Sequence, residues 1–181
     1  MFNPNLHHRR SIRLKGYDYS QAGMYFITIC CQDRSCRFGA IENGEMILND
    51  MGKLIEEEWQ YLKIKYPHIE LHEYVIMPNH FHAIVEIVGA GSARPKMETE
   101  KETKPPIPSE AGRANPAPTI GNIIGFFKYQ TTKKINLPVK LWQRNYYEHI
   151  IRNEQSYQNI SNYIINNPAK WTEDKFYTDR K

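Results

Sequence analysis

The sequence from residue 68 to residue 88 reads HIELHEYVIMPNHFHAIVEIV. Two runs rich in β-branched and aromatic residues flank a Pro78-Asn79 pair, a composition that favours strands on either side of a tight turn. We therefore predict one strand over His68–Met77 and a second that ends with Ala83–Val88. Together they would form an antiparallel hairpin.

The second strand of this hairpin has two chemically different faces, because successive side chains of a strand point to opposite sides. One face is wholly apolar and is predicted to be buried under helices. Its members are Phe81, Ala83, Val85 and Ile87. The other face begins, next to the turn, with the imidazoles of His80 and His82. Two imidazoles this close on a rigid strand can chelate one divalent ion, although the pattern alone is more typical of surface or hydrogen-bonded histidines.

The type of metal site follows from the number of ligands. A structural zinc ion takes four protein ligands, and Cys30, Cys31 and Cys36 lack the spacing of a zinc finger. Two histidines and one further ligand would leave open positions for a substrate oxygen, as in a catalytic site. The three cysteines are predicted to be free thiols in a reducing compartment.

The rest of the chain supplies the partners of the hairpin. Residue alternation, an Asn43-Gly44 turn signal and helical periodicity with capping residues define the further elements. They are a strand over Met24–Gln32, a hairpin over Phe38–Asn49, a helix capped by Asp50, a helix over Thr119–Ile135, strand-like stretches in Leu141–Ile151, and a helix over Asn153–Asn167 that Pro168 stops. This order predicts an α+β fold with a ferredoxin-like antiparallel sheet and packed helices.

Length and composition predict a single domain over residues 1–181, since 40% of the residues are hydrophobic. Residues 1–20 are predicted to form a basic arm. Residues 89–118, rich in Gly, Pro, Ser, Lys and Glu, are predicted to form a flexible loop. No apolar run reaches the roughly 20 residues of a membrane span, so we expect no membrane partner and a cytoplasmic location.

The net charge of +4 is unevenly distributed. Residues 7–15 read HHRRSIRLK, without an acidic residue. A second basic group is formed by Lys128, Lys133, Lys134, Lys140 and Arg144. Such clusters suit a polyanion, and equally a solvated surface.

Several segments resemble one protein family. Residues 77–82, MPNHFH, resemble the His-hydrophobe-His motif of the single-tyrosine transposases of HUH type (insertion-sequence 200-like). Three further segments resemble the branch associated with repetitive extragenic palindromes (REPs). They are Gly23–Thr28, the block WQRNYYEH at residues 142–149, and the ending YIINNP at residues 163–168. The resemblance covers nearly the whole chain outside residues 89–118 and implies the HUH single-tyrosine transposase fold.

The resemblance also implies a function, that of a metal-dependent endonuclease and strand transferase acting on single-stranded DNA at hairpin-forming repetitive elements. Tyr163 would attack a phosphodiester, form a 5′-phosphotyrosine intermediate and release a 3′ hydroxyl. His80, His82 and Asn167 would hold Mg²⁺ or Mn²⁺, and residues four apart on a helix share a face, so one helix can present Tyr163 and Asn167 together. A nearby divalent ion favours the phenolate of a tyrosine, whose ordinary pKa is about 10.

Some assignments stay open at this point. Without the resemblance, Tyr163 has the pattern of a core tyrosine, and Tyr129 and Tyr157 are its rivals. The alternative function is that of a non-cleaving DNA-binding protein of the same fold that recognises palindromic elements. Relatives act as monomers or as dimers that share the tyrosine helix, so a homodimer is compatible with the sequence. The protein would associate with the nucleoid when bound to DNA. The residues expected to contact DNA are Arg9, Arg10, Arg13, Lys15, Lys128 and Arg144.

Overall fold

The computed structural model describes residues 22–88 and 118–178. The predicted basic arm (1–20) and, apart from Pro118, the predicted loop (89–118) lie outside this part of the chain. The expected DNA contacts at Arg9, Arg10, Arg13 and Lys15 lie outside it as well. No helix in the described part is long and apolar enough to cross a membrane.

A four-stranded antiparallel sheet forms the centre of the fold. Its strands are β1 (Gly23–Cys30), β4 (Ile69–Met77), β5 (His80–Ile87) and β6 (Tyr147–Ile151), and their order across the sheet is β4-β5-β1-β6. The two central strands pair antiparallel with each other and with their outer neighbours. This topology confirms the predicted ferredoxin-like sheet and the hairpin of strands around the Pro78-Asn79 turn.

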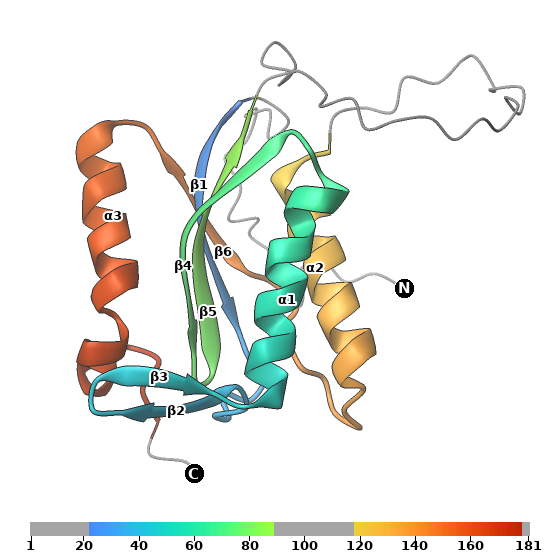
Figure 1. Cartoon of the computed structure of the whole chain (residues 1–181), viewed down its shortest axis with the longest axis vertical. Helices are drawn as coiled ribbons and strands as arrows, with labels where there is room; N and C mark the ends of the chain where they lie inside the picture. The colour runs from blue at the N-terminus through green and yellow to red at the C-terminus, as the bar shows by residue number, and fades with distance from the viewer. Residues whose placement is uncertain (1–21, 89–117, 179–181) are drawn as a thin grey trace, which may run out of the picture.

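Helices cover both faces of the sheet (Figure 1). On one face lie α1 (Asp50–Lys65) and α2 (Ile120–Ile135), and on the other lies α3 (Glu154–Asn166). The predicted apolar face of β5 packs under α1 and α2, where Phe81 is fully buried. Its ring lies 4.7 Å from that of Trp59 and 5.6 Å from that of Phe127. The opposite face of β5, with the two histidines, is therefore turned toward α3.

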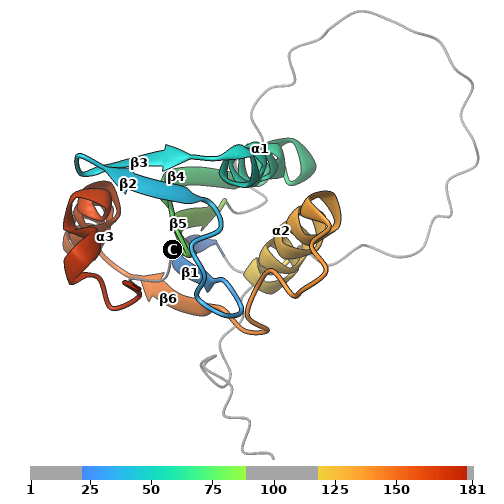
Figure 2. The ribbon, with the colours of Figure 1, turned by 90° about the horizontal axis from the view of Figure 1, so that it is seen from below.

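A small hairpin of β2 (Gly39–Glu42) and β3 (Glu45–Leu48) confirms the Asn43-Gly44 turn. Both turn residues have positive φ, 51° for Asn43 and 80° for Gly44, the geometry of the tight turn that Asn-Gly pairs favour. Seen from below, this hairpin runs from α1 toward α3 across one end of the sheet (Figure 2).

The predicted cap of α1 was wrong by one residue. The cap is Asn49, which is extended and whose Oδ1 accepts a hydrogen bond from the Gly52 amide at 3.0 Å. Asp50 is already helical, so its carboxylate lies in the first turn, where the helix dipole favours negative charge. Thr119 and Asn153, the first residues of the two helices predicted over Thr119–Ile135 and Asn153–Asn167, are the capping residues of α2 and α3, as expected.

The chain changes direction after α3. Pro168 ends the helix as predicted, but it also begins a short 3-10 helix, η1 (Pro168–Glu173), that the sequence analysis did not anticipate. The residues after η1 return to the beginning of β5, where the Phe176 carbonyl accepts a hydrogen bond from Asn79 Nδ2 at 2.8 Å. This return places the C-terminal segment beside the two histidines.

Candidate active site

His80 and His82 are fully buried at the start of β5, with their ring centroids 4.6 Å apart. Burial lowers the pKa of His80 to about 3, and the positive charge of Lys175 contributes. Burial is also the main reason why the pKa of His82 lies well below its ordinary value, followed by the charge of His80. Both imidazoles are therefore neutral at pH 7, the form that can bind a metal.

The hydrogen bonds of Asn79 define the tautomer of His80. Asn79 Nδ2 donates to the carbonyls of Arg34 (3.0 Å) and Phe176 (2.8 Å), so its Oδ1 must be the atom that faces His80 Nδ1 at 2.8 Å. An amide oxygen only accepts, and Nδ1 of His80 therefore carries the proton. Nε2 then has a free lone pair, and it is buried with no hydrogen-bond partner among the described residues. A buried, unpaired imidazole nitrogen is the arrangement expected of a metal ligand.

His82 is held in the same way by the neighbouring strand. Thr28 pairs with it in the sheet register, and the Thr28 hydroxyl lies 2.8 Å from His82 Nδ1. The Phe26 ring stacks against the imidazole with centroids 5.4 Å apart. These contacts fix the ring so that Nε2 points toward α3.

Tyr163 reaches this nitrogen from α3. Its hydroxyl lies 3.1 Å from His82 Nε2 and 3.2 Å from Asp174 Oδ2, while the residue as a whole is 40% exposed. Burial, and then the charge of Asp174, raise the pKa of Tyr163 to about 12. At neutral pH the group is a phenol, and it would need a nearby positive charge in order to act as a nucleophile.

Asp174, just after η1, was not singled out from the sequence. With His80 and His82 it completes a group of three side chains that could hold a metal ion. One ligand atom each from His80, His82 and Asp174 all lie within 4.8 Å of one another. The sequence gives no signal for Asp174, because only the direction of the chain after Pro168 brings it to β5.

Asn167, the third ligand expected from the family resemblance, lies at the same place. Its Nδ2 donates to Asp174 Oδ2 at 3.0 Å. Its Oδ1 is buried and has no hydrogen-bond partner among the described residues. Asn167 therefore contacts Asp174 through its amide nitrogen, and the role of its oxygen as a metal ligand stays a prediction.

A cavity of about 350 Å³ opens beside these groups and is lined in part by Phe26, His82, Tyr147, Tyr163 and Lys175. The Tyr163 hydroxyl is thus reachable from solvent. Lys175 adds the positive charge that a phosphate would require.

The other residues singled out from the sequence lie elsewhere. Tyr157 donates to the Glu73 carboxylate (3.0 and 3.2 Å). Tyr129 is 61% exposed on α2, which covers the opposite face of the sheet. Lys128 donates to the carbonyls of Gln143 (2.6 Å) and Arg144 (3.0 Å). The Arg144 side chain is exposed, and the DNA contacts expected of these two basic residues stay predictions.

The burial of the two histidines has a consequence for stability. In the unfolded chain they titrate near pH 6.5, whereas in the folded protein they stay neutral to lower pH. Below pH 6.5 the unfolded state therefore binds more protons, and stability falls as the pH falls, by up to about 1.4 kcal/mol per histidine and pH unit. We expect urea unfolding in the presence of EDTA to show a lower midpoint at pH 5 than at pH 7.5.

Two variants provide the control for this pH effect. His82→Asn should lose part of the pH dependence, whereas His149→Asn, at an exposed position of β6, should keep it. An equal dependence in both variants would contradict the assignment to the buried pair.

Comparisons with known proteins place the chain in a family and identify its fold. A protein of Haemophilus influenzae, described as uncharacterized, is 42% identical over 181 residues, which span 98% of each chain. The chain belongs to one family with this protein. The structure of a REP-associated tyrosine transposase bound to a REP hairpin superposes with a TM-score of 0.57, at 20% identity, over 89% of this chain and 74% of the other. No family model matches the chain.

The chain thus has the tyrosine transposase fold. The superposition confirms the fold that the family resemblance implied. In this protein the sheet carries the histidines and α3 of the same chain carries the tyrosine. The described residues of one copy are therefore sufficient to bring Tyr163 to the histidines.

Proposed function

We propose that this protein is a metal-dependent endonuclease and strand transferase that acts on single-stranded DNA at hairpin-forming elements. The observation that carries the proposal is the 3.1 Å distance between the Tyr163 hydroxyl and His82 Nε2. The Tyr163 hydroxyl thus lies against two neutral imidazoles and the Asp174 carboxylate, a group that could hold a metal ion, beside a cavity open to solvent.

The metal fits the residues that are present. The unpaired Nε2 of His80, His82 Nε2 and an oxygen of Asp174 or Asn167 would hold it. The oxygen donor suits both Mg²⁺ and Mn²⁺, and the two imidazole nitrogens favour Mn²⁺ of the two, with positions left open for substrate. When bound, the ion would supply positive charge that favours the phenolate and offsets charge on the phosphate.

The chemistry is a transesterification. The Tyr163 oxygen attacks the scissile phosphorus and its proton leaves to solvent. The bond from phosphorus to the 3′ oxygen breaks, and that oxygen takes up a proton to become a 3′ hydroxyl. The tyrosine is then joined to the 5′ phosphate of the other fragment. Attack by a 3′ hydroxyl reverses the step, so strands can be rejoined without ATP.

The substrate is proposed from charge and from the related fold. Lys175 beside the catalytic cavity, exposed Arg144 and the basic residues of the N-terminal arm would contact phosphates, which makes binding salt-dependent. The structural neighbour is bound to a REP hairpin, and a hairpin with a single-stranded flank is therefore the first substrate to test.

Incubation with 3′-labelled hairpin oligonucleotides and Mn²⁺ or Mg²⁺, followed by a denaturing protein gel, tests the function. We expect a labelled band at the mass of protein plus DNA, and mass spectrometry should assign the linkage to Tyr163. Tight binding without any adduct across varied hairpins would instead support the alternative of a non-cleaving DNA-binding protein.

The third metal ligand can be identified by comparing two variants. Asp174→Ala should weaken Mn²⁺ binding by about tenfold or more, and Asn167→Ala by less, because a carboxylate attracts a hard cation more strongly than an amide does. Isothermal titration calorimetry with Mn²⁺ measures both. A larger loss in Asn167→Ala would assign the ligand to the amide oxygen instead.

A further inference from the structure

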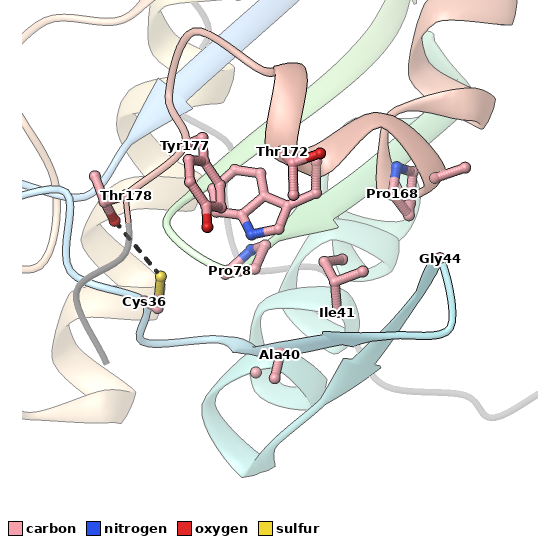
Figure 3. Close-up of a pocket in the computed structure, with 12 residues that line it drawn as sticks. Cys36, Ala40, Ile41, Gly44, Pro78, Pro168, Thr172, Tyr177 and Thr178 are labelled. Atoms are coloured by element: carbon pink, nitrogen blue, oxygen red, sulfur yellow. Dashed lines mark hydrogen bonds between the residues drawn. The ribbon is translucent and has the colours of Figure 1, made fainter.

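A second, larger cavity lies on the other side of the C-terminal segment. Its volume is about 700 Å³, within the range of ligand sites. The β2–β3 hairpin forms one wall, and η1 with the residues that follow forms the other (Figure 3). Pro78, in the turn before His80, also lines it.

The walls of this cavity are uncharged and partly aromatic. Trp171 and Tyr177 meet edge to face with ring centroids 5.3 Å apart, and Ile41 faces them from β2 (Figure 3). Hydroxyls of Thr172 and Thr178 add polar groups. None of the described residues that line the cavity carries a charge, so it is unsuited to a phosphate. It suits a neutral, planar ring with polar edges.

The cavity is connected to the proposed active site through Trp171. This ring lines the cavity and also lies against the His80 ring, with centroids 6.0 Å apart. Trp171 is only 9% exposed, and a group bound where its ring lines the cavity would be separated from the His80 imidazole by this indole ring. That is the neighbourhood of the scissile phosphate in the proposed reaction.

We propose that this cavity receives one unpaired base of the DNA strand, close to the phosphate that Tyr163 attacks. The assignment rests on the proposed function, which supplies single-stranded DNA to this end of the molecule. Aromatic rings bind unpaired bases by stacking, and hydroxyl and main-chain groups read their edges. The cavity would then determine which sequence flanks the cut.

The test measures DNA binding in Tyr163→Phe protein, so that no adduct forms. The probe is a fluorescent hairpin oligonucleotide whose single-stranded flank carries an abasic site at one position after another, and anisotropy reports the affinity. An abasic site at one position should lower the affinity by roughly five- to a hundredfold, the range that stacking of one base provides. Ile41→Trp, which fills the cavity, should weaken binding of the intact oligonucleotide by a similar factor. In this variant the oligonucleotide with that abasic site should bind no more weakly than the intact one.

A matched control comes from the other strand of the hairpin. Ile47 is 49% exposed on β3 and does not line the cavity, so Ile47→Trp should bind like the parent protein. If Ile41→Trp does not fold, as judged by circular dichroism, Ala169→Leu fills the cavity from the side of η1. Unchanged affinity in a folded, filled variant, or equal losses at every abasic position, overturns the proposal.

The outcome is separable from that of the proposed function. Adduct formation by the wild-type protein depends on Tyr163 and the histidines, whereas the position-dependent loss is a binding measurement that needs no cleavage. Adduct formation without any response of the filled variants would refute the base-binding cavity alone.

Discussion

Replacing Tyr163 with phenylalanine is expected to abolish the covalent protein–DNA adduct. The change removes only the hydroxyl that lies 3.1 Å from His82 Nε2. The ring keeps its edge-to-face contacts with Phe26 (6.2 Å) and His82 (5.2 Å), so folding and DNA binding should be preserved. Loss of a nucleophile lowers the rate by about 10³-fold or more, which places the adduct below detection on a gel of 3′-labelled DNA.

Tyr157→Phe is the matched control on the same helix. It breaks the hydrogen bonds to Glu73 but leaves the Tyr163 hydroxyl in place, and adduct formation should continue. A 5′-labelled substrate should yield a free fragment with a 3′ hydroxyl in the wild-type protein and in this control. Persistence of the adduct in Tyr163→Phe would show that another residue is the nucleophile.

The sheet could be predicted from the sequence because each strand carries its own pattern. On β5 the apolar residues alternate with the histidines, and Phe81, Ala83, Val85 and Ile87 are all buried in the core beneath α1 and α2. The Asn43-Gly44 turn and the caps of α2 and α3 are also determined by neighbouring residues. Alternation, turn residues and capping residues within each segment are therefore sufficient to predict these elements.

The candidate site could be predicted only in part, because it depends on contacts between distant segments. His80 and His82 are adjacent on one strand, and their shared face followed from alternation. Asp174 is brought to them by η1 and by the hydrogen bond between Asn79 and the Phe176 carbonyl, 97 residues apart. No periodicity or motif near residue 174 encodes that return of the chain.

The cavity between the β2–β3 hairpin and η1 could not be predicted for the same reason. In the sequence, Trp171 is an isolated aromatic residue near the end of the chain, and its contact with His80 arises only when η1 folds back. Features formed by two segments far apart in the chain require the tertiary structure.

His80→Ala and His82→Ala are each expected to abolish measurable Mn²⁺ binding and, with it, DNA cleavage. In the proposed site each histidine would contribute one of the few nitrogen ligands, and the neighbours that orient it could not replace it. Calorimetry should show no saturable binding in either variant. His149→Ala, at an exposed position of β6, should bind Mn²⁺ like the wild-type protein.

A graded variant separates loss of a metal ligand from a general disturbance of the strand. Thr28→Val keeps the shape of the side chain but removes the hydroxyl that lies 2.8 Å from His82 Nδ1. Loss of such an orienting partner lowers metal affinity by about 10- to 100-fold, so binding should be weakened but still saturable. Cleavage in Thr28→Val should then recover at high Mn²⁺ concentration, while the alanine variants of the histidines stay inactive. Recovery in the alanine variants as well would mean that the ion is held chiefly by Asp174, Asn167 and the DNA phosphate.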